Sequence, residues 1–217
     1  MEKWSESAWR AAAPVYDKIT EHPFIKELTD GTLDRSRFMH YLRQDSLYIS
    51  EYFRVLAHIA SRLRDSAFAS DFIGFAADGV YVEKTMHEVY LKDEPLTADV
   101  RMSPACELYT SMLKAQAYMP VEVEAAAVLP CFWVYQRVGE QIYTARDHSG
   151  NPYKAWIDTY GDPAFAESNR RAIAICDALA EQTTESVRRA MTDIFVKATR
   201  LEWLFWDSAY RKEVWPI

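Results

Sequence analysis

Hydrophobic positions recur with helical spacing along most of the chain. In the longer segments apolar residues return every three or four positions, which is the period of one face of an α-helix. Asp34, Pro163 and the pair Thr184 and Glu185 each suit the first turn of a helix. The pattern predicts an all-α chain with helices over about residues 3–21, a short stretch after Pro23, 34–64, 66–92, 103–118, 121–147, 152–160, 163–181 and 184–215.

Composition supports long helices in one domain. The chain has 217 residues, of which 49% are hydrophobic, and this is enough for a sizeable buried core. It contains only 6 glycines, under half of the usual share of about 7%. Repeats, low-complexity segments and Pro/Gly-rich linkers are absent from the sequence. We therefore expect a single-domain helical bundle over residues 1–217.

Charge and targeting signals narrow the class of protein. The formal net charge is −7, and no basic run could neutralise a phosphate backbone. The chain lacks an apolar window of about 18 residues, and residues 1–10 lack the apolar centre of a signal peptide. An odd number of cysteines, 3, favours a reducing compartment. We expect a cytoplasmic protein that binds neither nucleic acid nor membrane.

Asp45 interrupts an otherwise aromatic helical face. The other members of this face are Phe38, Tyr41, Tyr48 and Tyr52. A buried carboxylate needs hydrogen bonds or a counter-charge, and otherwise its pKa rises. Two interpretations are open: a buried functional acid, or a position at the rim from which the carboxylate reaches solvent.

Glu202 lies in the centre of a second aromatic-rich face. The face consists of Phe195, Ala198, Glu202, Phe205 and Ala209, with Trp203 and Trp206 on its flanks. Such surroundings raise the pKa of a carboxyl group toward neutrality, where it can both donate and accept a proton. The alternative is a surface salt bridge to Arg200 or Arg211.

Cys131 lies on an apolar helical face directly after Pro130. A proline inside a helix removes an amide and clashes with the carbonyl four residues back, here that of Ala126, so we expect a bend at this point. A bend could direct the thiol into a cavity. The simpler interpretation is a small core residue, which is also how we interpret Cys106 and Cys176.

The motifs predict neither a metal nor a cofactor. Glu83 and His87 have ligand-like spacing, but the sequence lacks the Glu-x-x-His pattern that di-iron bundles repeat. The glycine-rich motifs that bind phosphates are also absent from the sequence. Aromatic residues make up 14% of the chain, which suits a pocket for a flat heteroaromatic ligand or simply an aromatic-rich core.

Several separated motifs occur in an order typical of one enzyme family. They are residues 22–24 (HPF) with 31–33 (GTL), 41–48 (YLRQDSLY), Glu83 with His87, 129–135 (LPCFWVY) with 139–140 (GE), 156–160 (WIDTY), 202–206 (EWLFW) and 209–211 (AYR). Over almost its whole length the chain thereby resembles the TenA family, known as thiaminase II or aminopyrimidine aminohydrolase.

The resemblance implies a haem oxygenase-like helical fold without haem, assembled as a homotetramer. It also implies a role in thiamin salvage, with no cofactor. Family members release 4-amino-5-hydroxymethyl-2-methylpyrimidine from thiamin or from 4-amino-5-aminomethyl-2-methylpyrimidine, a degradation product of thiamin. The partner of this chain would then be a small aminopyrimidine or thiamin.

The resemblance also assigns roles to residues. Cys131 matches the family nucleophile, Asp45 the acid that holds the amino edge of the pyrimidine, and Glu202 the residue that transfers protons. The presence of Cys131 indicates the cysteine-bearing branch of the family. The pocket positions match Tyr48, Tyr109, Tyr135, Tyr160 and Phe205.

One departure from the family pattern surrounds the C-terminal acid. Leu201 and Trp203 flank Glu202 where the family often has tyrosines, which removes two hydroxyls from its surroundings. Two other functions remain open. One is a pyrimidine-binding or regulatory protein without turnover, and the other is a di-iron oxygenase that rests on Glu83 and His87 alone.

Overall fold

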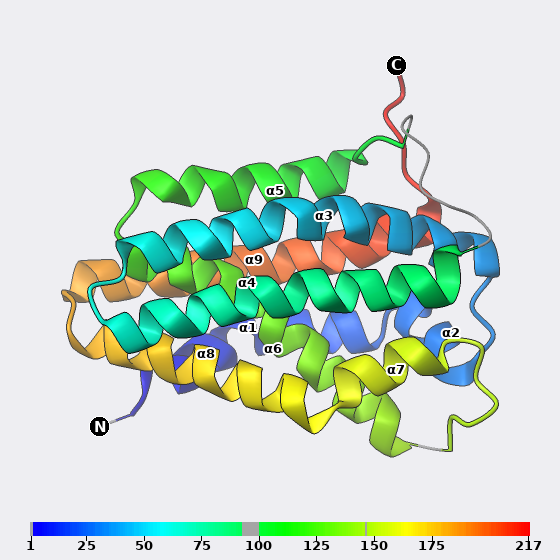
Figure 1. Cartoon of the computed structure of the whole chain (residues 1–217), viewed down its shortest axis with the longest axis horizontal. Coiled ribbons are helices and arrows are strands. Elements are labelled where there is room, and N and C mark those ends of the chain that lie inside the picture. Colours follow the sequence, from blue (N-terminus) through cyan, green and yellow to red (C-terminus); the bar gives the residue numbers. More distant parts are fainter. Residues whose placement is uncertain (1, 93–99, 146) are drawn as a thin grey trace.

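The computed structural model describes residues 2–92, 100–145 and 147–217, with the side chains of residues 82–84 and 87 also left undescribed. Every regular element in these ranges is helical, which confirms the predicted all-α class (Figure 1). In chain order the elements are α1 (Trp4–Thr20), α2 (Pro23–Asp30), α3 (Arg35–Arg62), α4 (Ser66–Met86), η1 (His87–Leu91), α5 (Pro104–Ala115), η2 (Gln116–Tyr118), α6 (Val121–Ala145), α7 (Lys154–Gly161), α8 (Pro163–Glu181) and α9 (Glu185–Arg211).

Polar side chains cap three of the predicted helix starts, at Asp34 and Thr184 as expected and at Asp162, directly before Pro163. The Asp34 side chain accepts hydrogen bonds from the amides of Ser36 and Arg37 at the start of α3. Asp162 accepts from the amide of Ala164 at the start of α8, and Thr184 accepts from that of Val187 at the start of α9. These side chains satisfy amides that have no partner inside the helix, so the local sequence fixes where each helix begins.

Helix ends differ more from the prediction. The segment predicted as one helix to residue 92 consists of α4 and the short π-helix η1. Helix α9 ends at Arg211 rather than near residue 215, because Lys212 adopts a left-handed conformation with φ 52° and its amide bonds back to Ala209. Glycine usually occupies that conformation, so a lysine at this position did not predict the helix end. Helix α6 continues through Pro130, and the bend expected there stays a prediction.

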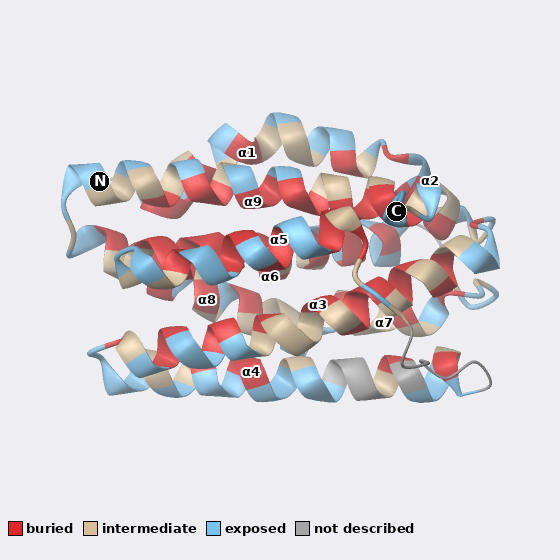
Figure 2. Cartoon of the chain, turned by 90° about the horizontal axis from the view of Figure 1, so that it is seen from above, coloured by how far each residue is buried: buried red, intermediate tan, exposed pale blue. Residues whose placement is uncertain are grey.

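The core lies between the inward faces of the long helices. Helix α6 packs along α9 and is covered by α7 and α8, while α3 pairs with α4 and also contacts α9 (Figure 1). Buried positions follow the inward faces of these helices, and exposed positions follow the outward ones (Figure 2). The largest fully buried side chains include Trp156, Trp206, Tyr41 and Tyr109. The aromatic surplus of the sequence is therefore concentrated in the core. Within the described ranges, no helix is both long and apolar enough to cross a membrane.

Candidate active site

A cavity of about 80 Å³ lies among helices α3, α4, α6, α7 and α8. Four residues of the predicted site, Asp45, Cys131, Tyr135 and Tyr160, contribute to its wall. The remaining lining residues are Ile49, Tyr52, Phe75, Asp78, Gly79, Phe132, Phe165 and Ser168. The wall is mostly aromatic and apolar, with two carboxylates and one thiol, which is the composition of a pocket for a flat ligand with a few polar groups.

The other predicted site residues form a connected group beside this cavity. The Tyr109 hydroxyl donates a hydrogen bond of 2.7 Å to Glu202 Oε1. The ring of Tyr48 lies 4.9 Å from that of Tyr109 and 5.7 Å from that of Phe205. Tyr48 also stacks on Tyr52, which lines the cavity, with 5.3 Å between ring centroids. The structure thus brings the predicted residues of α3, α5, α6, α7 and α9 into one neighbourhood.

Both acids of this group are buried. Asp45 is 9% exposed and Glu202 is 2% exposed. The interpretation of Asp45 as a solvent-exposed rim residue is therefore wrong. So is the interpretation of Glu202 as a surface salt bridge, because Arg211 pairs instead with Asp207 at 2.7 Å. Packing across helices decides between the alternatives that periodicity left open.

The carboxyl group of Glu202 has a raised pKa. Burial raises its pKa to about 8, and the nearby charge of Asp45 adds to the rise, whereas the hydrogen bond from Tyr109 opposes it. A second buried glutamate shows the contrasting arrangement. Glu124 is 1% exposed and is paired with Arg62 and with His58, whose Nδ1 lies 2.7 Å away. The Arg62 guanidinium pairs with Glu124, whereas a neutral phenol donates to Glu202.

Cys131 has the environment of a protonated thiol that faces the cavity. It is only half-buried by surface area because it lines an open space, yet protein atoms surround it. Burial raises its pKa well above the ordinary value, the charge of Glu202 raises it further, and the Tyr48 hydroxyl opposes the shift. The thiol therefore needs a proton acceptor before it can act as a nucleophile.

The raised pKa of Glu202 predicts a pH-dependent effect on stability. Between its ordinary pKa of 4.5 and about 8, the folded chain keeps a proton that the unfolded chain releases. Stability is thus lost as pH rises through this window, by several kcal/mol in total. Glu202→Gln removes this titrating carboxyl group. The stability of the variant relative to the parent, measured by urea unfolding, should therefore increase between pH 5 and pH 8. The exposed control Glu181→Gln should show no such trend, and an equal trend in both variants would contradict the assignment.

Gly139 allows α6 and α7 to approach closely. A Cβ atom at this position would lie 2.5 Å from the backbone carbonyl of Tyr160. The Tyr160 ring in turn lies 4.9 Å from that of Tyr135, and both rings line the cavity. The glycine therefore sets the position of one wall of the site.

We expect Gly139→Ala to destabilise the protein by about 1–3 kcal/mol, because the added methyl group forces α7 away from α6. Thermal unfolding measures this change. Gly74 on α4 provides the control, since a Cβ there meets nothing within 4 Å, and Gly74→Ala should be neutral or slightly stabilising. Equal stability of the two alanine variants would refute the close-approach argument.

Sequence reasoning missed the part of the wall that comes from α4 and α8. Phe75, Asp78, Phe165 and Ser168 line the cavity although none of them interrupts a helical pattern. Phe165 and Ser168 are one turn apart on α8, and this spacing is the only signal we find for them. Their role in the site follows from how α4 and α8 cross the cavity, which periodicity within one helix does not report.

The di-iron hypothesis rests on two residues whose side chains the structure does not describe. The side chains of Glu83 and His87 are outside the described part of the structure. Among the residues that are described, no three His, Cys, Asp or Glu side chains are grouped as metal ligands.

Comparison with known proteins identifies the family. The family model described as "TENA/THI-4/PQQC family" matches residues 9–212. The chain is 34% identical to the aminopyrimidine aminohydrolase of Bacillus subtilis, covering 98% of this chain and 92% of that protein. It is also 34% identical to the thiamine biosynthesis multifunctional protein ThiED of Corynebacterium efficiens, covering 96% of this chain but only 28% of that longer protein.

A solved structure agrees over the whole fold. The TenA homologue from P. horikoshii OT3 superposes with a TM-score of 0.85 at 27% identity, covering 97% of this chain and 99% of that one. The helical order, the cavity between the helices and the match over nearly the full length lead to one conclusion: the chain belongs to the TENA/THI-4/PQQC family.

Proposed function

We propose that this chain is an aminopyrimidine aminohydrolase of thiamin salvage, which releases 4-amino-5-hydroxymethyl-2-methylpyrimidine from its 5-aminomethyl analogue and from thiamin. The observation that carries the proposal is that Asp45 and Cys131 line one aromatic cavity, while Glu202, buried on a third helix, lies near enough for its charge to raise the pKa of the Cys131 thiol. The name of the Bacillus subtilis relative, which matches over nearly its full length, supports the same activity.

The wall of the cavity suits the substrate ring. The rings of Tyr135 and Tyr160 offer faces on which a pyrimidine can stack. The carboxylate of Asp45 would accept a hydrogen bond from the 4-amino group, which orients the ring and favours its protonated form. Tyr135 is itself held in place, because the Tyr41 hydroxyl lies 3.5 Å from its hydroxyl and accepts from the Trp156 indole at 3.1 Å.

Cys131 and Glu202 would begin the reaction together. At neutral pH both hold a proton, since burial raises the pKa of each. Glu202 donates its proton to a ring nitrogen while the sulfur of Cys131 adds to the ring, and the thiol proton replaces the one that Glu202 gave up. The cavity then gains no net charge, which matters because an unpaired charge in such a site is costly.

Departure of the leaving group follows from the addition. An electron pair of the ring adduct, which is no longer aromatic, expels the amine or thiazole from the exocyclic carbon, and Asp45 stabilises the positive charge that the ring acquires. Water adds to that carbon, and the proton that it releases goes to the departed ammonia or, with thiamin, to solvent. Loss of the Cys131 sulfur restores the aromatic ring, and the ring proton returns to the sulfur through Glu202.

A binding protein without turnover is the alternative function, because the same aromatic pocket would serve it. Calorimetry with hydroxymethylpyrimidine, set beside a chromatographic product assay with aminomethylpyrimidine, separates the two. The proposal predicts both binding and product formation. Binding without product would support the alternative and overturn the proposal.

The proposal also covers the oligomeric state of the chain and its location in the cell. As the family resemblance implies, the chain would act as a homotetramer in the cytoplasm, where the Cys131 thiol stays reduced. Light scattering on the purified protein tests the assembly, and a monomeric mass would contradict it.

A further inference from the structure

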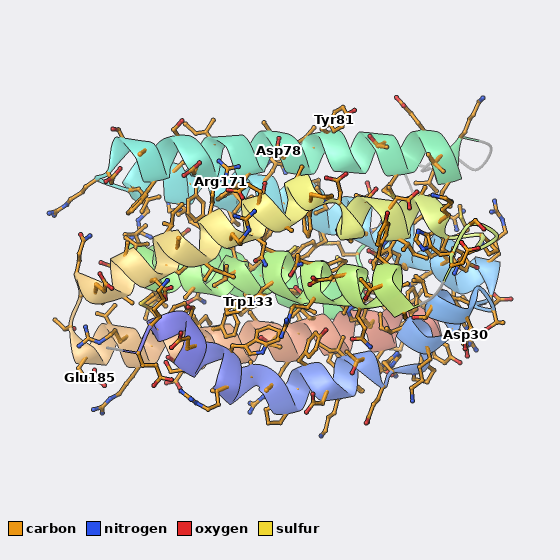
Figure 3. All side chains as sticks on the ribbon, turned by 90° about the horizontal axis from the view of Figure 1, so that it is seen from below. Asp30, Asp78, Tyr81, Trp133, Arg171 and Glu185 are labelled. Atoms are coloured by element: carbon orange, nitrogen blue, oxygen red, sulfur yellow. The ribbon has the colours of Figure 1, made fainter. Side chains whose placement is uncertain are left out.

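A second, more open pocket adjoins the cavity. It has a volume of about 360 Å³ and lies between α4, α7 and α8. Asp78, Phe165 and Ser168 belong to the walls of both spaces, so the two are neighbours that share one partition. Figure 3 labels Asp78 and Tyr81 on α4, the helix that contributes them to the wall of this pocket.

The size of the inner cavity requires such a neighbour. At about 80 Å³ it is smaller than the engineered cavity of about 150 Å³ that holds a single benzene ring. The inner cavity is therefore too small to enclose a whole aminopyrimidine substrate. The outer pocket adjoins it across the shared partition, so the part of a substrate that the inner cavity cannot hold has space there.

The outer pocket has the chemistry of a site for cations. Its described lining contains the carboxylates of Asp78 and Asp162 and no basic side chain. The nearby guanidinium of Arg171 is already occupied, because it pairs with Asp71 and lies over the ring of Phe75. Asp162 caps α8 through Oδ1, which accepts from the Ala164 amide at 2.6 Å. The carboxylates attract positive charge, and the aromatic rings of Tyr81 and Phe165 offer faces that a cation can approach.

We propose that the outer pocket is a subsite for the positively charged leaving group, binding the thiazolium ring of thiamin or the ammonium group of the aminomethyl substrate. This inference rests on the proposed function, since it assumes that a pyrimidine occupies the inner cavity. Asp78 lies between the two spaces and contacts the junction of ring and leaving group, whereas Asp162 acts on the leaving group alone. The pair would set how strongly cationic substrates are preferred over the neutral product.

The test compares two ligands that differ in charge. Thiamin carries the cation and hydroxymethylpyrimidine lacks it, so the ratio of their dissociation constants isolates the outer pocket. Calorimetry is performed on the Cys131→Ser background, where turnover is expected to cease. We expect Asp162→Asn, which keeps the helix cap, to weaken thiamin binding about 2–5-fold and the double variant Asp78→Asn/Asp162→Asn about 10-fold at low salt. Binding of hydroxymethylpyrimidine should stay unchanged in Asp162→Asn.

Controls make the outcomes distinct. Asp193→Asn alters an exposed aspartate of α9 outside both pocket linings and should change neither constant. Added salt should weaken thiamin binding in the parent more than in the double variant. Unchanged thiamin affinity in the double variant, with normal pyrimidine binding, would overturn the subsite while leaving the proposed function intact. Failure of the unsubstituted pocket to bind either ligand would overturn both.

Discussion

Replacing Cys131 with serine should abolish turnover, with a fall in kcat of at least about 10³-fold. The hydroxyl has almost the same size as the thiol and fits the same place in the cavity wall. It is, however, a far weaker nucleophile, and its proton is much harder to remove. Helicity and pyrimidine binding should remain those of the parent, which circular dichroism and calorimetry measure beside the product assay.

Cys106 provides the matched control for this change. It is fully buried, and burial raises the pKa of its thiol to about 12. Its sulfur donates to the Gln44 carbonyl at 3.5 Å, a bond that a serine hydroxyl can also make. Cys106→Ser should therefore keep its activity. Full turnover in Cys131→Ser would refute the covalent mechanism.

Glu202→Gln should lower kcat by about 10²–10⁴-fold, the range expected when a general acid is removed. Glutamine keeps the shape of the side chain and can still accept from Tyr109, but it has no proton to transfer. The pH profile adds a second readout. The parent should lose activity as pH rises past about 8, because Glu202 then loses the proton it must donate. The residual activity of the glutamine variant should lack this falling limb.

Tyr109→Phe also tests the proton-transfer role of Glu202, because it changes the pKa of the carboxyl group without removing that group. The Tyr109 hydroxyl lowers the pKa of Glu202 through its hydrogen bond, so its removal should move the falling limb to higher pH. The variant keeps the ring that packs against Tyr48. An unchanged kcat and pH profile in Glu202→Gln would contradict the proton-transfer role.

Periodicity and capping predicted most of the fold. Apolar spacing indicated the long helices, and Asp34, Asp162 and Thr184 cap them in the structure. The helix ends were harder to predict. They depend on backbone conformations, such as the left-handed one of Lys212, that the residue type does not indicate.

The candidate site was only partly visible in the sequence. Asp45 and Glu202 stood out because they break aromatic faces, but periodicity could not decide whether they were buried. That depends on which helices cover them, as the burial of both residues shows. Contacts between distant segments were also hidden. His58 and Glu124 are 66 positions apart and lie 2.7 Å from each other, a contact that helical spacing does not reveal. The walls from α4 and α8 were missed for the same reason.

The most direct test of the account follows the oxygen of the product. The purified protein is incubated with 4-amino-5-aminomethyl-2-methylpyrimidine in ¹⁸O-labelled water, and the pyrimidine product is analysed by mass spectrometry. The account predicts hydroxymethylpyrimidine that carries one ¹⁸O atom, formed together with an equal amount of ammonia. Recovery of the unchanged aminomethyl compound, under conditions where the protein is folded and binds hydroxymethylpyrimidine, would contradict it.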